Sequence, residues 1–169
     1  YTAMTEKLDP EEVKEIMSRI FREISQVVAR YEGWLYQLIG DEAMIFFGLP
    51  KAHEDDPFRA IRAAREIHDR VEALSPQYEG RIGRSLSMHS GIQTGQVATG
   101  ELILEKGVYG EITGVTVNLA SRISDLAKAG EILVGPETFR RAQGAFVFQA
   151  LRPAQVQGTS RAIQAYKVV

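Results

Sequence analysis

Two groups of residues have types and spacings that could do chemistry. Asp41 follows Gly40 between two runs of strand-forming residues, and a carboxylate at the tip of a hairpin can bind a divalent ion that prefers oxygen ligands. Asn118 and Arg122 stand four residues apart in a predicted helix, so their side chains project together. A guanidinium binds phosphate oxygens, and a neighbouring amide can hydrogen-bond a sugar. A plain turn and a solvated helix face are the structural alternatives for these two groups.

The spacing of the glycines and the histidines points less clearly to a functional site. Gly91, Gly95 and Gly100 could let backbone amides approach a ligand, although isolated glycines in strands more often mark bulges. The three histidines lie in different predicted elements, without metal-ligand spacing or an evident serine partner. The sequence therefore gives no support for a zinc site or a hydrolytic triad.

The composition is that of an ordinary folded domain. The 169 residues are 44% hydrophobic, and 20 Lys and Arg against 22 Asp and Glu give a net charge of -2, which argues against a nucleic-acid polymer as partner. The chain has no cysteine, so it holds no disulfide or thiolate site, and this agrees with a cytoplasmic location. No apolar run approaches the roughly 20 residues that cross a bilayer. We therefore expect no membrane contact by this domain.

The elements that must position Asp41 lie in the first half of the chain. Asp9, Pro10 and Glu12 predict a helix start, with Asp9 as the N-cap. Apolar residues then recur every three or four positions up to Tyr31 and predict one wide buried stripe. Bulky residues on both sides of Gly40-Asp41 predict a hairpin within 34–47. A second helix is predicted to start at 55–57, with Arg59, Arg62, Arg65 and Arg70 in water.

The elements around Asn118 and Arg122 are less regular. Thr113 or Gly114 is predicted to open a third helix, and another helix is expected after Pro136. Strands are expected near 85–88, 91–97, 101–104, 131–134, 146–151 and 162–168. This order favours an α+β sandwich, with helices packed on a mostly antiparallel sheet, as a single domain over 1–169.

Four blocks of the sequence, in order and spacing, resemble the class III adenylate and guanylate cyclase catalytic domain. They are 40–48 (GDEAMIFFG), 53–56 (HEDD), 91–95 (GIQTG) and 114–122 (GVTVNLASR). The resemblance covers nearly the whole chain, and the last block is its most specific part. It implies a ferredoxin-like α+β core and a head-to-tail homodimer, with each active site assembled from both subunits.

The resemblance also implies a metal site. In that family two aspartates hold two divalent ions, Mg²⁺ or Mn²⁺, that activate the ribose 3′-hydroxyl and neutralise the triphosphate. Asp41 matches the second aspartate. The first would lie four positions before Tyr1, and Tyr1 and Thr2 match the end of its motif, where backbone amides meet the terminal phosphate. We therefore expect that the chain lacks its first strand, was excised from a larger multidomain protein, and is inactive as it stands.

The remaining matches concern the nucleotide. Asn118 matches the residue that orients the ribose, and Arg122 matches the one that stabilises charge on the α-phosphate, both acting from the partner subunit. Gln37 stands where adenylate cyclases usually carry a base-reading lysine, and Glu111 where its acidic or small partner is expected. An amide at adenine N1 and a carboxylate at the exocyclic amine favour ATP, although a carboxylate also suits guanine. Gln157 replaces a triphosphate-binding lysine, which could cost about 1 to 3 kcal/mol of charged contact.

Two functions remain in competition. The first is a cyclase that makes cyclic AMP and pyrophosphate from ATP, or acts on GTP, in intracellular signalling. The second is a degenerate cyclase-like module that binds nucleotide or dimerises to regulate attached domains without turnover, as Gln37 and Gln157 would allow. An unrelated ferredoxin-like ligand-binding domain rests on fold analogy alone.

Overall fold

The computed structural model describes residues 1–99, 112–155 and 161–169. The chain forms two compact units, Tyr1–Met88 and His89–Val169. Each has a hydrophobic core of its own. The sequence shows no linker or change of composition at the point where one unit ends and the next begins.

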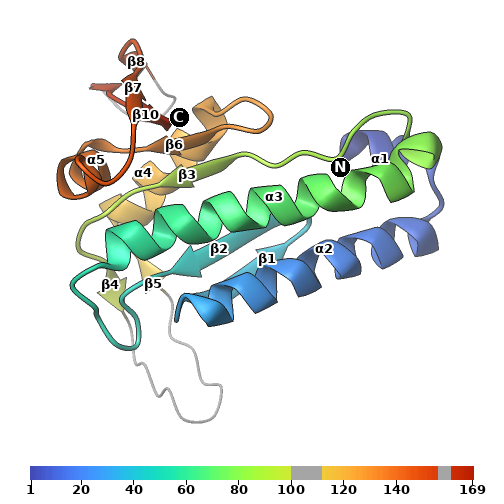
Figure 1. Cartoon of the computed structure of the whole chain (residues 1–169), viewed down its shortest axis with the longest axis horizontal. Coiled ribbons are helices and arrows are strands. Elements are labelled where there is room, and N and C mark those ends of the chain that lie inside the picture. The colour runs from blue at the N-terminus through green and yellow to red at the C-terminus, as the bar shows by residue number, and fades with distance from the viewer. Residues whose placement is uncertain (100–111, 156–160) are drawn as a thin grey trace. The chain divides into compact units, whose positions relative to one another are not determined.

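The first unit consists of three helices and one hairpin. Helices α2 and α3 run side by side, and the hairpin packs on them through Leu35, Ile45 and Phe47 (Figure 1). The elements are α1 (Thr2–Lys7), α2 (Pro10–Arg30), β1 (Trp34–Ile39), β2 (Glu42–Phe46) and α3 (Asp56–Ile82).

Helix α2 confirms its sequence prediction at the start and along the buried stripe. The Asp9 carboxylate accepts a hydrogen bond from the Glu12 amide at 3.0 Å, and Pro10 occupies the first turn. Ile16 and Val27 are fully buried in the core. The period of the apolar residues therefore identified the face that packs against the rest of the unit.

Helix α3 is predicted correctly in its start but not in all of its surface. Arg62 and Arg65 are exposed as expected. Arg59 and Arg70 are half-buried instead, because each forms an ion pair, with Asp55 at 2.8 Å and with Glu23 at 3.0 Å. The second of these pairs joins α3 to α2.

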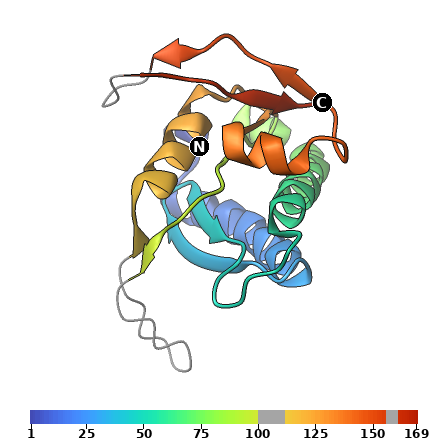
Figure 2. The same ribbon diagram turned by 90° about the vertical axis from the view of Figure 1, so that its left-hand side faces the viewer.

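The second unit is built on a four-stranded sheet of order β3-β6-β10-β7. Strands β3 and β6 are parallel, and the other two pairings are antiparallel. Figure 2 shows the antiparallel partners β7 and β10 as neighbouring orange and red arrows. Helix α4 packs on β3 and β6, and Ile123 and Leu133 are completely buried in this core. The elements are β3 (Ser90–Ile92), β4 (Ala98–Thr99), β5 (Ile112–Thr113), α4 (Val115–Leu126), β6 (Ile132–Val134), α5 (Pro136–Ala142), β7 (Phe148–Ala150), β8 (Ala154–Gln155), β9 (Ala162–Ile163) and β10 (Tyr166–Val168).

The expected α+β class, with helices packed on antiparallel-rich sheets, is confirmed. The strand predicted at 85–88 is wrong, because Leu86 is buried and its amide bonds the Ser75 hydroxyl at 2.8 Å rather than a strand. Helix α1 is an element that sequence patterning did not predict. The strand expected at 101–104 lies outside the described residues. None of the helices described here combines the length and apolar character of a membrane-crossing segment.

Candidate functional site

Asp41 occupies the turn of the β1–β2 hairpin. Gly40 has a φ of 58°, a left-handed conformation that glycine adopts without steric cost. Asp41 itself is exposed, and among residues 1–99, 112–155 and 161–169 its carboxylate has no hydrogen-bond or ion-pair partner. The turn therefore presents a free carboxylate to a ligand.

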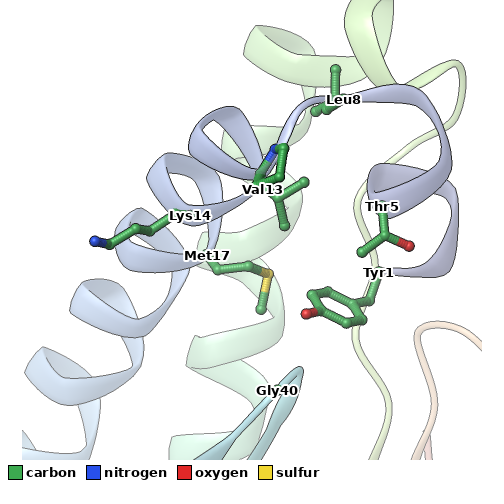
Figure 3. A pocket seen from close by; sticks show the side chains of 8 residues that line it. Tyr1, Thr5, Leu8, Val13, Lys14, Met17 and Gly40 are labelled. Carbon is green, nitrogen blue, oxygen red and sulfur yellow. The ribbon is translucent and has the colours of Figure 1, made fainter.

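A pocket of about 350 Å³ lies beside this turn. Tyr1, Thr5 and Met17 line it together with Gly40, and Figure 3 shows the Tyr1 ring directed toward Met17 and Gly40. The predicted phosphate-binding residue Tyr1 thus borders the same pocket as the residue that precedes Asp41. Thr2, the other predicted phosphate contact, is exposed at the start of α1.

Gln37 lies on the hairpin face that is directed away from the helices. Ala43 and Ile45 pack on the core, so Met44 between them points outward. Gln37 is the cross-strand partner of Met44, and directly opposite residues share one face of a sheet. A bulge between Leu35 and Gln37 produces this register. Without the bulge, Gln37 would share the inward face of Leu35.

Asn118 and Arg122 lie on one face of α4, as predicted. Their positions differ by four residues, so one side chain stands above the other. Asn118 is exposed and Arg122 is half-buried. Neither side chain has a hydrogen-bond or ion-pair partner within the described part of the chain. A half-buried guanidinium without an internal carboxylate is suited to bind an external anion.

The carboxyl groups with shifted pKa values are not among the candidate residues. A hydrogen bond from Arg59 lowers the pKa of Asp55. Hydrogen bonds from Arg140 and Arg141 lower the pKa of Glu137 to about 2. Both are surface ion pairs, which hold helix ends and do not mark a catalytic group.

A family model described as the adenylate and guanylate cyclase catalytic domain matches residues 1–169. The chain belongs to this family. Its fold is therefore that of a cyclase catalytic domain. The family resemblance that the four sequence blocks indicated is confirmed.

Individual cyclases match over the same length. Adenylate cyclase 1 of Rhizobium meliloti (strain 1021) is 28% identical over 171 residues, which cover 100% of this chain and 26% of that protein. The crystal structure of the adenylyl cyclase CyaB from P. aeruginosa has a TM-score of 0.88 and 28% identity, and covers 99% of this chain and 87% of its own. The crystal structure of the guanylyl cyclase Cya2 has a TM-score of 0.87 and 28% identity, and the match covers 99% of this chain and 85% of the Cya2 chain.

Two facts follow from these matches. The chain spans about a quarter of the length of the curated relatives it matches. It is as similar to a solved adenylyl cyclase as to a solved guanylyl cyclase, at 28% identity each. Sequence identity therefore does not select the purine, and the residues that contact the base must do so.

Cyclase domains of this family depend on a metal ion, and Asp41 is the candidate ligand that the described residues include. Asp41 supplies the hard oxygen donors that Mg²⁺ and Mn²⁺ prefer. No group of three or more His, Asp or Glu side chains that could hold a metal occurs in residues 1–99, 112–155 and 161–169. Asp41 therefore offers one carboxylate, and the described residues do not surround it with a complete ligand set. The predicted contacts Glu111 and Gln157, and Gly100, lie outside the described residues.

Proposed function

We propose that residues 1–169 act as one nucleotidyl cyclase domain that converts ATP to cyclic AMP and pyrophosphate in intracellular signalling. The observation that carries this proposal is the pair Asn118 and Arg122, whose side chains project from α4 with no partner among residues 1–99, 112–155 and 161–169. In the proposed head-to-tail homodimer, one protomer contributes Asp41 and the other contributes this pair. Both protomers are needed because each active site draws on two copies of the chain.

The proposed reaction is an in-line displacement within one nucleotide. The ribose 3′-oxygen attacks the α-phosphorus and loses its proton, while the bond from that phosphorus to the bridging oxygen breaks and pyrophosphate leaves. Arg122 donates hydrogen bonds to the α-phosphate oxygens as charge develops on them. Asn118 hydrogen-bonds the ribose and so holds the attacking oxygen in line.

Asp41 would hold divalent ions together with a second carboxylate. When bound, Mg²⁺ or Mn²⁺ supplies positive charge that favours the deprotonated 3′-oxygen and the leaving pyrophosphate. The contribution of this chain is to present the Asp41 carboxylate at a hairpin turn, where no described residue binds it. The backbone of Tyr1, which borders the pocket beside this turn, and of Thr2 is the proposed contact of the terminal phosphate.

The purine is proposed to lie against the outward face of the hairpin. Gln37 would donate its amide N–H to adenine N1, and Glu111 would accept from the exocyclic amine. Guanine carries N–H groups at N1 and N2, so it requires acceptors where adenine requires a donor. The Gln37 amide can supply either, so it does not decide the purine by itself. Gln37 and Glu111 together match adenine, and we therefore place ATP first and GTP second. Gln157 would contact the triphosphate through an amide in place of a cation.

The test uses the native protein, with whatever sequence flanks residues 1–169. ATP and GTP are offered separately with Mn²⁺ or Mg²⁺, and cyclic nucleotide is measured. Arg122→Ala is expected to lower kcat about 100-fold or more, as the loss of a transition-state donor does. Arg62→Ala, an exposed arginine on α3, is the matched control and should leave kcat unchanged.

The same assay tests the metal ligand. Asp41→Ala is expected to abolish turnover at ordinary Mn²⁺ concentrations, and Asp69→Ala on the exposed face of α3 is its control. Nucleotide binding without product in the native protein would favour the regulatory module instead. Steady product from both Asp41→Ala and Arg122→Ala would refute the proposed site.

A further inference from the structure

Helix α4 sits directly on a glycine of the sheet. A Cβ atom at Gly91 would lie 2.6 Å from the Ala120 carbonyl oxygen and 2.7 Å from Ser124 Cα, and it would also overlap the Ser124 amide. All three atoms belong to the backbone of α4, which cannot move aside one atom at a time. Any side chain at this position would therefore lift the whole helix from β3 (Figure 1).

The residues that contact Gly91 are on the same rigid helix as the candidate nucleotide contacts. Ala120 and Ser124 form one stripe of α4, and Ile123 packs into the core beside it. Asn118 and Arg122 occupy the stripe on the other side of Ile123, by the helical period. A displacement of α4 moves these two side chains by about the same amount.

A second contact fixes the first turn of the helix. The Thr116 hydroxyl donates to the Gln96 carbonyl at 2.6 Å. Gly95 makes room for this bond, because a Cβ atom there would lie 2.5 Å from Thr116 Oγ1. The segment that follows β3 thus holds the end of α4 that is nearer to Asn118.

We propose that Gly91 and Thr116 are positioning residues that set how far Asn118 and Arg122 reach toward the nucleotide. This inference rests on the proposed function, since it assigns to these two residues the geometry of that same site. Neither Gly91 nor Thr116 touches the substrate. Misplacement of catalytic groups by about 1 Å costs on the order of 100-fold in rate, so a small lift of α4 has a large effect.

The first experiment compares two glycine-to-alanine variants in the native protein. Gly91→Ala is expected to lower kcat about 10- to 100-fold, with a much smaller change in KM. Gly80→Ala is the matched control, because a Cβ atom there meets nothing within 4 Å. It should keep wild-type kcat. Equal kcat values for the two variants would overturn the proposal.

Mixed dimers separate a displaced helix from a general folding defect. A 1:1 mixture of Asp41→Ala and Arg122→Ala protomers should regain about one quarter of wild-type activity, because half of the dimers are mixed and each holds one intact site of two. Gly91→Ala should rescue Asp41→Ala to the same extent, since its own Asp41 is intact. It should not rescue Arg122→Ala, because both partners then lack a functional α4.

The outcomes distinguish this inference from the function on which it rests. No recovery in the Asp41→Ala and Arg122→Ala mixture refutes the proposed two-chain site. Recovery in that mixture and also in the Gly91→Ala and Arg122→Ala mixture refutes the positioning role of Gly91 and leaves the two-chain site standing.

Thr116 provides a milder test if Gly91→Ala does not fold. Thr116→Val keeps the shape of the side chain and removes the donor to Gln96, and we expect kcat to fall about tenfold at unchanged fold. Thr116→Ser restores the hydroxyl and should restore kcat. Wild-type kcat in Thr116→Val, or no rescue by serine, would contradict the positioning role.

Discussion

Gln37 and Met44 are cross-strand partners on the outward face of the β1–β2 hairpin, and the bulge between Leu35 and Gln37 makes them so. Trp34 and Phe46 are also paired on this face, and the Tyr36 ring lies 5.5 Å from each of their rings. The proposed base-reading amide therefore stands next to an aromatic and apolar surface. Such a surface suits a flat purine ring.

Replacement of Gln37 should change the preference between purine nucleotides. Gln37→Lys places a permanent donor at the position of adenine N1, so we expect the ratio of kcat/KM for ATP over GTP to rise at least about tenfold. Gln37→Glu should move the ratio toward GTP. Competition assays with both nucleotides measure the change. Gln77→Lys on the exposed face of α3 is the control, and an equal shift there would contradict the assignment.

The N-cap of α2 should contribute measurably to stability. Asp9→Ala removes the acceptor for the Glu12 amide, and we expect a loss of about 1 kcal/mol in the free energy of unfolding. Urea denaturation gives this value. Asp9→Asn keeps a capping oxygen and should retain most of the stability, so an equal loss in both variants would argue against the cap.

The Ser75 hydroxyl should contribute measurably to the free energy of unfolding. Its buried hydroxyl accepts from the Leu86 amide at 2.8 Å and donates to Glu79 at 2.9 Å. Ser75→Ala leaves the buried amide without a partner, which costs about 1 to 3 kcal/mol of unfolding free energy. Ser87→Ala, at an exposed position, should change stability by less than about 0.5 kcal/mol. A silent Ser75→Ala would show that water replaces the hydroxyl.

The lowered pKa of Glu137 should make the stability of the fold depend on pH in the acid range. The Arg140 and Arg141 side chains lower its pKa in the folded protein from 4.5 to about 2. Because the folded pKa is the lower one, this carboxylate stabilises the fold above about pH 4.5, and the contribution disappears as the pH falls toward 2. Glu137→Gln should therefore be less stable than wild type at pH 6, by a small amount because the pair is exposed. The difference should vanish near pH 2 in thermal melts.

The sequence predicted those parts of the fold that depend on neighbouring residues. The start of α2 follows from Asp9 and Pro10, and the hairpin turn follows from Gly40-Asp41, because caps and tight turns are local. The prediction of a strand at 85–88 is wrong because a strand also needs a partner strand, and the Leu86 amide instead bonds to Ser75.

In the candidate site, too, the features that depend on neighbouring residues were predicted and those that depend on distant residues were not. Residue type and spacing identified Asp41, Asn118 and Arg122, and the structure keeps them exposed or half-buried, with no side-chain partner in the part of the chain that it describes. The bulge that turns Gln37 outward depends on the register of the opposite strand. The contact of Gly91 with α4 joins residues about thirty positions apart, and no local pattern indicates it. Glu111 and Gln157 lie outside the described residues and stay predictions.

The division of the chain after Met88 also sorts the proposed contacts by segment. The metal residue Asp41 and the base contact Gln37 precede it. The base contact Glu111, the ribose residue Asn118 and the α-phosphate residue Arg122 follow it. A chimera that crosses over to a relative at His89 would therefore inherit its hairpin from one parent and its catalytic helix from the other. Recombination at a single junction would in this way part Gln37 from Glu111 and Asp41 from Arg122, so an active hybrid requires two parents whose halves are matched.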